Sequence, residues 1–229
     1  MAATGHMGPG LFEFFRDLTE NNDREWFNAN KGRYESEVRD PLLRFISDFE
    51  TKLHAISPHF VADARLSGGS LFRIYRDVRF SRDKTPYKTQ AGVQFRHEVG
   101  KDVHAPGFYL HLDPSNALSG GGIWHPDAPT LTKIRDAIVG KASEWEAITN
   151  DERILSTHQF GGDSLKRPPR GFDPDHPLIE DLKKKTHFVH TDYDEDEITG
   201  PDFLDRFATD CAAVSPYMRF LTEAVGLPF

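Results

Sequence analysis

A change of hydrophobic period in the middle of the chain is the strongest constraint on the fold. Apolar and polar residues alternate over 70–80, 91–97 and 107–113, which is the pattern of β-strands with one buried face. The connections between these segments are too short for the crossover that parallel strands require. The sequence therefore predicts an antiparallel meander, with a further strand over 117–124 and another over 186–193.

The segments on either side of this region have helical spacing instead. Apolar residues recur at three- and four-residue steps over 11–22 and over 40–56, where Asp40 is the expected N-cap and Pro41 the first-turn residue. Asp23 is the expected N-cap of a helix between these two, and Asp127 that of a helix after the strands. A last helix is expected over 201–225. Pro216 should kink or break it.

We expect a single α+β domain over 10–229, in which an antiparallel sheet of four to five strands packs against N-terminal and C-terminal helices. Residues 1–9 include a Gly-His-Met sequence, and we expect them to be an expression remnant or a disordered N-terminus. The Gly- and Pro-rich segment 158–177 has no periodicity. It is therefore predicted to be a long loop, which in a compact domain is usually functional or mobile.

Charge and composition argue against several classes of function. The 229 residues carry a formal net charge of -8, and nucleic-acid binding is not expected because it requires a basic surface. No run of about 18 apolar residues occurs, so no membrane span is expected. The single cysteine, Cys211, lies in an apolar helical pattern and is expected in the core. One unpaired cysteine suits a reducing compartment, and we expect a cytoplasmic location.

The segment RIYRDVRFSRDKTPYKT, residues 73–89, concentrates positive charge in this acidic chain. Between residues 71 and 96, seven Lys or Arg stand against two Asp, a local balance of 7 - 2 = +5. Strand alternation predicts Arg76 on the same face as Phe72 and Ile74, where an unpaired guanidinium would be costly. Arg76 is therefore expected to meet an anion, either a carboxylate of the protein or a ligand.

Two interpretations of this basic segment remain open. In the first it forms a cleft for a small anionic molecule, because forked arginine donors match carboxylate or phosphate, and the loop 158–177 adds a basic lid. The expected ligand-binding residues are Arg73, Arg76, Arg79, Lys84, Tyr87, Lys88, Gly121, Gly122, Trp124, Lys166 and Arg167. In the second, the acidic run 192–210 neutralises the segment within the fold. The protein is then a non-catalytic protein-protein interaction module.

A second group of candidate residues lies on the polar face of 107–113. Tyr109, His111 and Asp113 alternate there, and His111 with Asp113 is the candidate catalytic pair. An imidazole titrates near neutral pH, and a nearby carboxylate fixes its tautomer. The alternative is a half-buried histidine bonded to a backbone carbonyl. No paired metal-binding spacing occurs, so no metal is expected, and the sequence indicates neither a cofactor nor an oligomeric state.

The glycines at 120–122 also have two interpretations. Consecutive glycines can form an anion-binding concavity or let a ligand approach the backbone closely. They can instead form a bulge or admit another backbone. Neither the phosphate-loop nor the dinucleotide glycine pattern is present, so no nucleotide is predicted.

Several ordered motifs together resemble the family known as domain of unknown function 2461, found in bacteria and fungi. The motifs are WFxxNKxxYE (26–35), RIYRDVRFSRDKTPYKT (73–89), GFYLHLDP (107–114), GGGIWHP (120–126) and LKRPPRGFDPDHP (165–177). The resemblance runs from about residue 10 to the C-terminus and implies an α+β domain. It implies no substrate, because no reaction is assigned to the family. Its basic motif positions include Arg73, Arg76, Arg79, Lys84 and Lys88 together with Lys166 and Arg167, which favours a shared anion-binding cleft.

Overall fold

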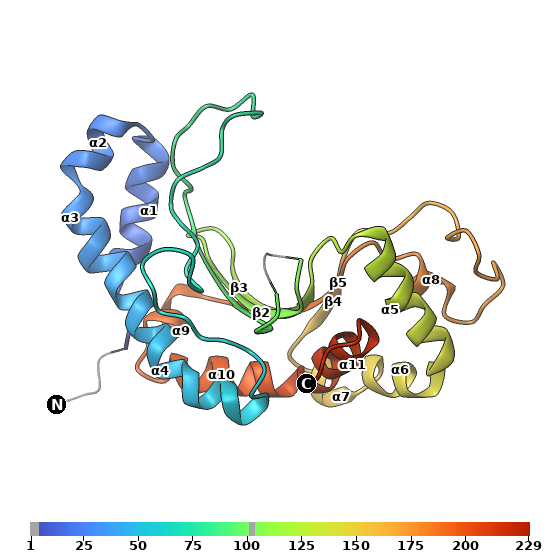
Figure 1. Cartoon of the computed structure of the whole chain (residues 1–229). Helices are drawn as coiled ribbons and strands as arrows, with labels where there is room; N and C mark the ends of the chain where they lie inside the picture. The colour runs from blue at the N-terminus through green and yellow to red at the C-terminus, as the bar shows by residue number, and fades with distance from the viewer. Residues whose placement is uncertain (1–4, 101–103) are drawn as a thin grey trace.

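An antiparallel sheet of five strands, in the order β1-β2-β3-β5-β4, is the centre of the structure (Figure 1). The structure is a computed structural model, and it describes residues 5–100 and 104–229. The strands are β1 Ala91–Arg96, β2 Gly107–Leu112, β3 Ala117–Ile123, β4 Gln159–Gly161 and β5 His187–Tyr193. The predicted α+β class and the antiparallel meander from β1 to β3 are confirmed. So is the strand expected over 186–193.

The expected strand over 70–80 was wrong. Residues 70–80 are all described, and they form only two isolated bridges, Leu71 with Val93 and Tyr75 with Tyr87. The backbone leaves the edge of β1 after Phe72 and then pairs with its own return segment. The N–H of Arg76 donates to the carbonyl of Pro86 at 2.9 Å, and the N–H of Lys88 donates to that of Ile74 at 2.8 Å. Residues 73–88 therefore form a projecting arm, which we call the arm (Figure 1).

Strand β4 was missed, because it lies inside the segment predicted as a loop. It has only three residues, too few for a periodic signal, and it exists because Phe160 and its neighbours pair with β5. In the rest of that segment, Ser164 forms an isolated bridge with Lys184, which follows α8 Ile179–Leu182.

Helices precede and follow the sheet, as predicted. On the N-terminal side these are α1 Gly10–Glu20, α2 Arg24–Ala29, α3 Lys31–Arg33, a π-helical turn Tyr34–Arg39 and α4 Asp40–Ile56. After β3 come α5 Ala128–Gly140, α6 Ala142–Thr149 and α7 Glu152–Leu155. The chain closes with α9 Glu195–Thr199, α10 Phe203–Ala213 and α11 Ser215–Ala224, so the break expected near Pro216 is confirmed.

The predicted caps are confirmed at two of three positions. The side chain of Asp23 accepts from the N–H of Trp26, and that of Asp127 accepts from the N–H of Thr130, each at 2.9 Å. Asp40 is not a cap, because the helix is continuous from Lys31 through the π-helical turn. That turn ends at Arg39, two residues before Pro41, whose ring would otherwise clash with a carbonyl one turn back.

One face of the sheet carries the core. The inward side chains of β1 to β3 alternate with outward ones and are fully buried, as Phe95, Phe108 and Leu110 show. Helices α4, α10 and α11 cover this face (Figure 1), with Phe49 of α4 at 4.7 Å from Phe95 between ring centroids. Cys211 of α10 is 2% exposed in this layer, as predicted. No helix among the described residues has the length and apolarity needed to cross a membrane.

The first described residues pack against α4. Met7 is 1% exposed and belongs to the core, and a ring nitrogen of His6 lies 2.8 Å from a carboxylate oxygen of Asp48. Met7 and His6 thus pack against the fold, whereas Gly8 and Pro9 are exposed. Residues 1–4 lie outside the described residues, and the expression-remnant origin of the segment stays a prediction.

His187 of β5 gives the fold a dependence on pH. Its ring is buried against Trp145 of α6, and neither ring nitrogen has a hydrogen-bond partner among the described residues. Burial, aided by the positive charges of Lys184 and Arg135, lowers the pKa of His187 from 6.5 to about 3. Below about pH 6.5 the unfolded chain therefore binds a proton that the folded protein does not. The free energy of unfolding falls as the pH falls through that window, by roughly 2 kcal/mol at about pH 5.

We expect His187→Phe to remove the part of the pH dependence of the unfolding free energy that His187 causes, because the new ring packs on Trp145 but cannot be protonated. Denaturant unfolding at about pH 7 and about pH 5 measures the difference in free energy. His54→Phe on the exposed side of α4 is the control for the exchange of an imidazole for a phenyl ring. Burial also lowers the pKa values of His111 and His158, which therefore act in the same direction. An unchanged pH dependence in His187→Phe would show that His187 is protonated in the folded state.

Candidate functional site

The face of the sheet opposite α10 and α11 carries a cleft of about 520 Å³. In Figure 1 this face lies between the arm with α1–α3 on one side and α5 with α8 on the other. Its aromatic lining comes from Phe72 at the base of the arm, Tyr109 of β2, Trp124 just after β3, and Phe188 of β5. The volume is within the range of small-molecule sites, about 300–1,000 Å³.

Strand register explains why the middle of the cleft is hollow. One row of outward residues runs across four strands, from Gln94 through Tyr109 and Gly120 to His190. Gly120 has no side chain, so a gap remains between the Tyr109 and His190 side chains. The next row repeats this arrangement, with Gly122 beside Phe188. The floor of the cleft is therefore formed by the backbone of β3, and its walls are formed by the rings of side chains such as Tyr109, Phe188 and His190.

The glycines also serve a second purpose, which is to admit a neighbouring backbone. A Cβ added at Gly120 would lie 2.2 Å from the carbonyl oxygen of Val189, and one at Gly122 would lie 2.1 Å from that of His187. Gly121 faces the opposite side, where a Cβ would lie 2.7 Å from the sulfur of Met218. The three glycines belong to the β3 ladders rather than to an anion-binding loop. The predicted binding residues Gly121, Gly122 and Trp124 all line the cleft.

His111 lies in the cleft, and its hydrogen-bond partner is Tyr109. The hydroxyl of Tyr109 is 3.3 Å from Nδ1 of His111. Burial lowers the pKa of His111, an effect that the charge of Asp113 partly opposes, and burial raises the pKa of Tyr109 to about 12. The carboxylate of Asp113 instead accepts from the N–H of Ser115 at 2.8 Å and from its hydroxyl at 2.6 Å. Asp113 thus acts on the imidazole by charge, and Tyr109 acts by hydrogen bonding.

Sequence reasoning missed the polar groups on the far wall and at the edges of the cleft. Gln94, Asn116 and His190 line it, and Nδ1 of His190 is buried without a hydrogen-bond partner among the described residues. Alternation in the predicted strand 186–193 already places Phe188 and His190 on one face. The sequence did not indicate the strand order, which places β5 beside the glycines of β3.

Most of the predicted basic residues brace the arm and do not line the cleft. One guanidinium nitrogen of Arg76 lies 2.5 Å from Asp83 and also bonds Thr85, while Arg79 lies 2.6 Å from Asp77. The ammonium group of Lys84 donates to the carbonyl of Val78 at 2.9 Å. Tyr87 is buried, and its ring stacks on Phe27 of α2 with 4.1 Å between centroids.

The anion expected for Arg76 is therefore Asp83, a carboxylate of the arm itself. The acidic run 192–210 was the wrong internal partner. Its carboxylates pair with Arg16, Lys52 and Arg206, the last through Asp210 at 2.9 Å.

Lys88 and Arg73 lie at the base of the arm, next to Phe72. Nζ of the half-buried Lys88 lies 5.4 Å from the centroid of the Phe72 ring, and this ring lines the cleft. Neither Lys88 nor Arg73 lines the cleft itself. Burial lowers the pKa of Lys88, and the positive charge of Arg73 lowers it further. Within the described part of the chain, no carboxylate lies within 4.0 Å of either cation. Lys166 and Arg167 are exposed in the segment before α8 and do not line the cleft.

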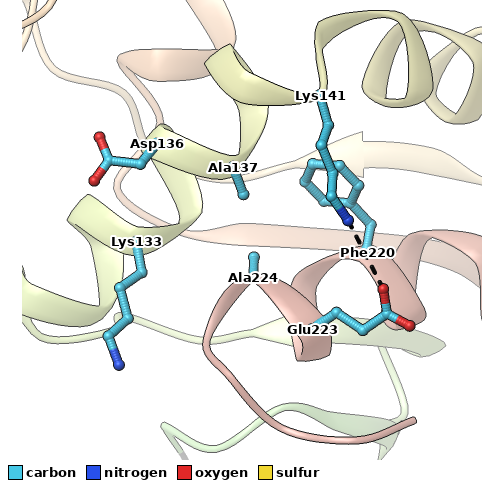
Figure 2. A pocket seen from close by; sticks show the side chains of 7 residues that line it. All are labelled: Lys133, Asp136, Ala137, Lys141, Phe220, Glu223 and Ala224. Carbon is cyan, nitrogen blue, oxygen red and sulfur yellow. Dashed lines mark ion pairs between the residues drawn. The ribbon is translucent and has the colours of Figure 1, made fainter.

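A second hollow of about 350 Å³ lies between α5 and α11 (Figure 2). Lys141 crosses the ring of Phe220 toward Glu223, and the charged atoms of the pair are 3.9 Å apart. Its charged groups already have partners or are exposed, and it has a single aromatic wall. The sheet cleft combines four aromatic walls with half-buried polar groups, and we therefore take it as the candidate site.

No set of three His, Cys, Asp or Glu side chains gathers at metal-binding distance among the residues that the structure describes. A family model with the description "Conserved hypothetical protein (DUF2461)" matches residues 10–220. The matched range contains all five strands and every residue that lines the cleft. No match was found among curated proteins.

Proposed function

The chain belongs to the DUF2461 family, and we propose that its sheet cleft binds a small, planar, anionic molecule. The observation that carries this proposal is the position of Lys88, which is half-buried beside Arg73 and lies over Phe72, one of the aromatic rings that line the cleft. This keeps the predicted class of ligand and reduces the predicted set of basic residues to two.

The ring of the ligand is expected to lie on the glycine floor. Pairs of aromatic side chains stand at the two ends, Phe72 with Tyr109 at 6.0 Å and Trp124 with Phe188 at 5.5 Å between centroids. Flat apolar surfaces of this kind favour stacked or edge-on contact with a planar group. Neutral groups such as Gln94 supply the hydrogen bonds that orient a ligand in sites of this composition.

The anionic group of the ligand is expected to lie between Lys88 and Arg73. A half-buried cation beside a second cation is unfavourable in the ligand-free protein, because desolvation and like-charge repulsion act in the same direction. A carboxylate or phosphate at this point would remove the repulsion and give charge-assisted hydrogen bonds. The phenyl ring of Phe72 would then bridge this group to the ring system in the cleft.

Lys88→Met provides the test, because the proposal predicts opposite effects on stability and on binding. Without ligand, the variant should unfold at a higher temperature than the parent, since the half-buried charge is gone while the long apolar side chain remains. Binding of an anionic ligand should weaken roughly 10- to 100-fold, which is the effect of losing about 1.5–3 kcal/mol of charged hydrogen bonding.

The measurement is a thermal-shift screen of aromatic carboxylates and aromatic phosphates, each beside its neutral amide or alcohol analogue. The acids should stabilise the parent protein and the neutral analogues should not, whereas neither should stabilise Lys88→Met. Lys84→Met is the matched control, because Lys84 is an exposed lysine of the same arm that bonds the carbonyl of Val78 and does not line the cleft. A lower unfolding temperature for ligand-free Lys88→Met, or equal stabilisation by the neutral analogues, would argue against the proposal.

A catalytic role for His111 remains part of this proposal. Because burial lowers its pKa, the imidazole is neutral near pH 7 and is able to take a proton from a bound molecule. The contact with Tyr109 would orient the ring, and Asp113 would stabilise the protonated form by charge. We expect the protein to act in the cytoplasm, where a single buried thiol such as Cys211 stays reduced.

A further inference from the structure

The tip of the arm exposes an aromatic ring that the fold does not use. Phe80 is 95% exposed, and the guanidinium of Arg79 lies 5.9 Å from the centroid of its ring. In Figure 1 the arm rises from the sheet beside α1–α3, and its far end stands away from the labelled helices and strands. An aromatic side chain next to arginine is the composition that protein interfaces favour in their centres.

The arm is held in shape by its own contacts. Arg76 with Asp83 and Lys84 with the carbonyl of Val78 cross-link its two sides, and Tyr87 on Phe27 fixes its base. A segment with a fixed shape loses little conformational freedom on binding. The exposure of Phe80 is therefore a property of an ordered element.

The arm and the rest of the chain have opposite charges. The arm carries six Lys or Arg and two Asp, a balance of 6 - 2 = +4, so the remainder carries -8 - 4 = -12. Residues 192–202, which we call the acidic segment, contain six Asp or Glu and neither Lys nor Arg. Asp196 and Asp202 in this segment are exposed, and neither makes an ion pair within the described part of the chain.

We propose that the arm of one molecule docks on the acidic segment of a second copy of the same chain. Each copy has one arm and one acidic segment, so a dimer with twofold symmetry makes the same contact twice. Phe80 supplies the apolar centre of the contact. Arg82, an exposed arm residue that forms no ion pair within the described residues, faces the carboxylates of the other copy.

Sedimentation velocity of the full chain over a range of protein and salt concentrations tests this proposal. The parent protein should dimerise at low ionic strength and dissociate as salt rises, because exposed charges are screened. Phe80→Ala should weaken the dimer by about tenfold or more, as for an aromatic residue at the centre of an interface. Leu155→Ala, which shortens an exposed apolar side chain on α7, should leave the dimer unchanged.

Variants with reversed charges then distinguish specific docking of the arm from nonspecific electrostatic attraction between molecules. Arg82→Glu and Asp196→Lys should each weaken self-association, and an equimolar mixture of the two variants should form a heterodimer. All these positions are exposed, so the variants should keep the parent unfolding temperature and the ligand response of the cleft. The proposal is overturned by a parent protein that stays monomeric at every concentration. A dimer that Phe80→Ala does not weaken, or a mixture that does not associate, would overturn it equally.

Discussion

The Gly122→Ala variant is expected to lose about 3 kcal/mol of unfolding free energy, the combined effect of overpacking and backbone strain. Gly122 has a φ of 155°, and a Cβ there would lie 2.1 Å from the carbonyl oxygen of His187 and 2.6 Å from Cα of Phe188. Both neighbours are backbone atoms of β5. The variant must therefore push β5 away from β3 at the floor of the cleft. Denaturant unfolding measures the loss.

Gly32→Ala is the matched control for this prediction. Gly32 lies in α3, where nothing stands within 4 Å of an added Cβ, so alanine should be neutral or stabilise the helix by up to about 1 kcal/mol. If Gly122→Ala kept the parent stability, the close approach of β3 and β5 would not be a requirement of the fold. The glycines would then matter only for the ligand.

The Phe27→Ala variant is expected to lose about 3–5 kcal/mol, the usual effect of removing a buried phenyl ring. Phe27 of α2 is 2% exposed and stacks on Tyr87, and it also contacts Tyr34 at 5.5 Å between centroids. Because it joins the helices to the base of the arm, its loss should release the arm before the sheet unfolds. Hydrogen exchange should then accelerate at the amide of Lys88, which bonds the carbonyl of Ile74.

Phe80→Ala is the control on the same arm. Phe80 is exposed at the tip, and its removal should change the free energy of unfolding by less than about 0.5 kcal/mol. Equal losses in the two variants would mean that the tip packs against the protein. An unchanged exchange rate at Lys88 in Phe27→Ala would mean that the arm is held by its backbone contacts alone.

The strands of the sheet were predictable where one of their faces packs against the core and the other faces the cleft. Alternation over 107–113 has a direct physical cause, because Phe108 and Leu110 point into the core while Tyr109 and His111 point into the cleft. The same pattern over 70–80 has a different cause. Ile74 is buried on the arm, whose outgoing and return segments bond each other beyond the edge of β1. Period alone does not distinguish a strand of the sheet from an arm that leaves it.

The candidate site was predictable only in part, because it depends on strand order. His111 and the glycines were found from local patterns, whereas His190 reaches the same cleft only because β5 inserts between β3 and β4. The arginines were misplaced for a related reason. Arg76 was expected to need an anion from far away, yet the return segment of the arm brings Asp83 to it across seven residues.

The one cysteine of the chain gives the protein an internal probe. Cys211 is enclosed between α10 and the sheet, and burial raises the pKa of its thiol well above 9.0, so a thiol reagent should not react with the folded form. Labelling should occur only when α10 separates from the strands, at a rate set by that opening. The rate of Cys211 labelling can therefore be compared between the Gly122→Ala and Phe27→Ala variants under native conditions, and no reporter has to be introduced. A single enclosed thiol also means that a covalent disulfide link between folded copies is not expected, so an observed dimer would be noncovalent.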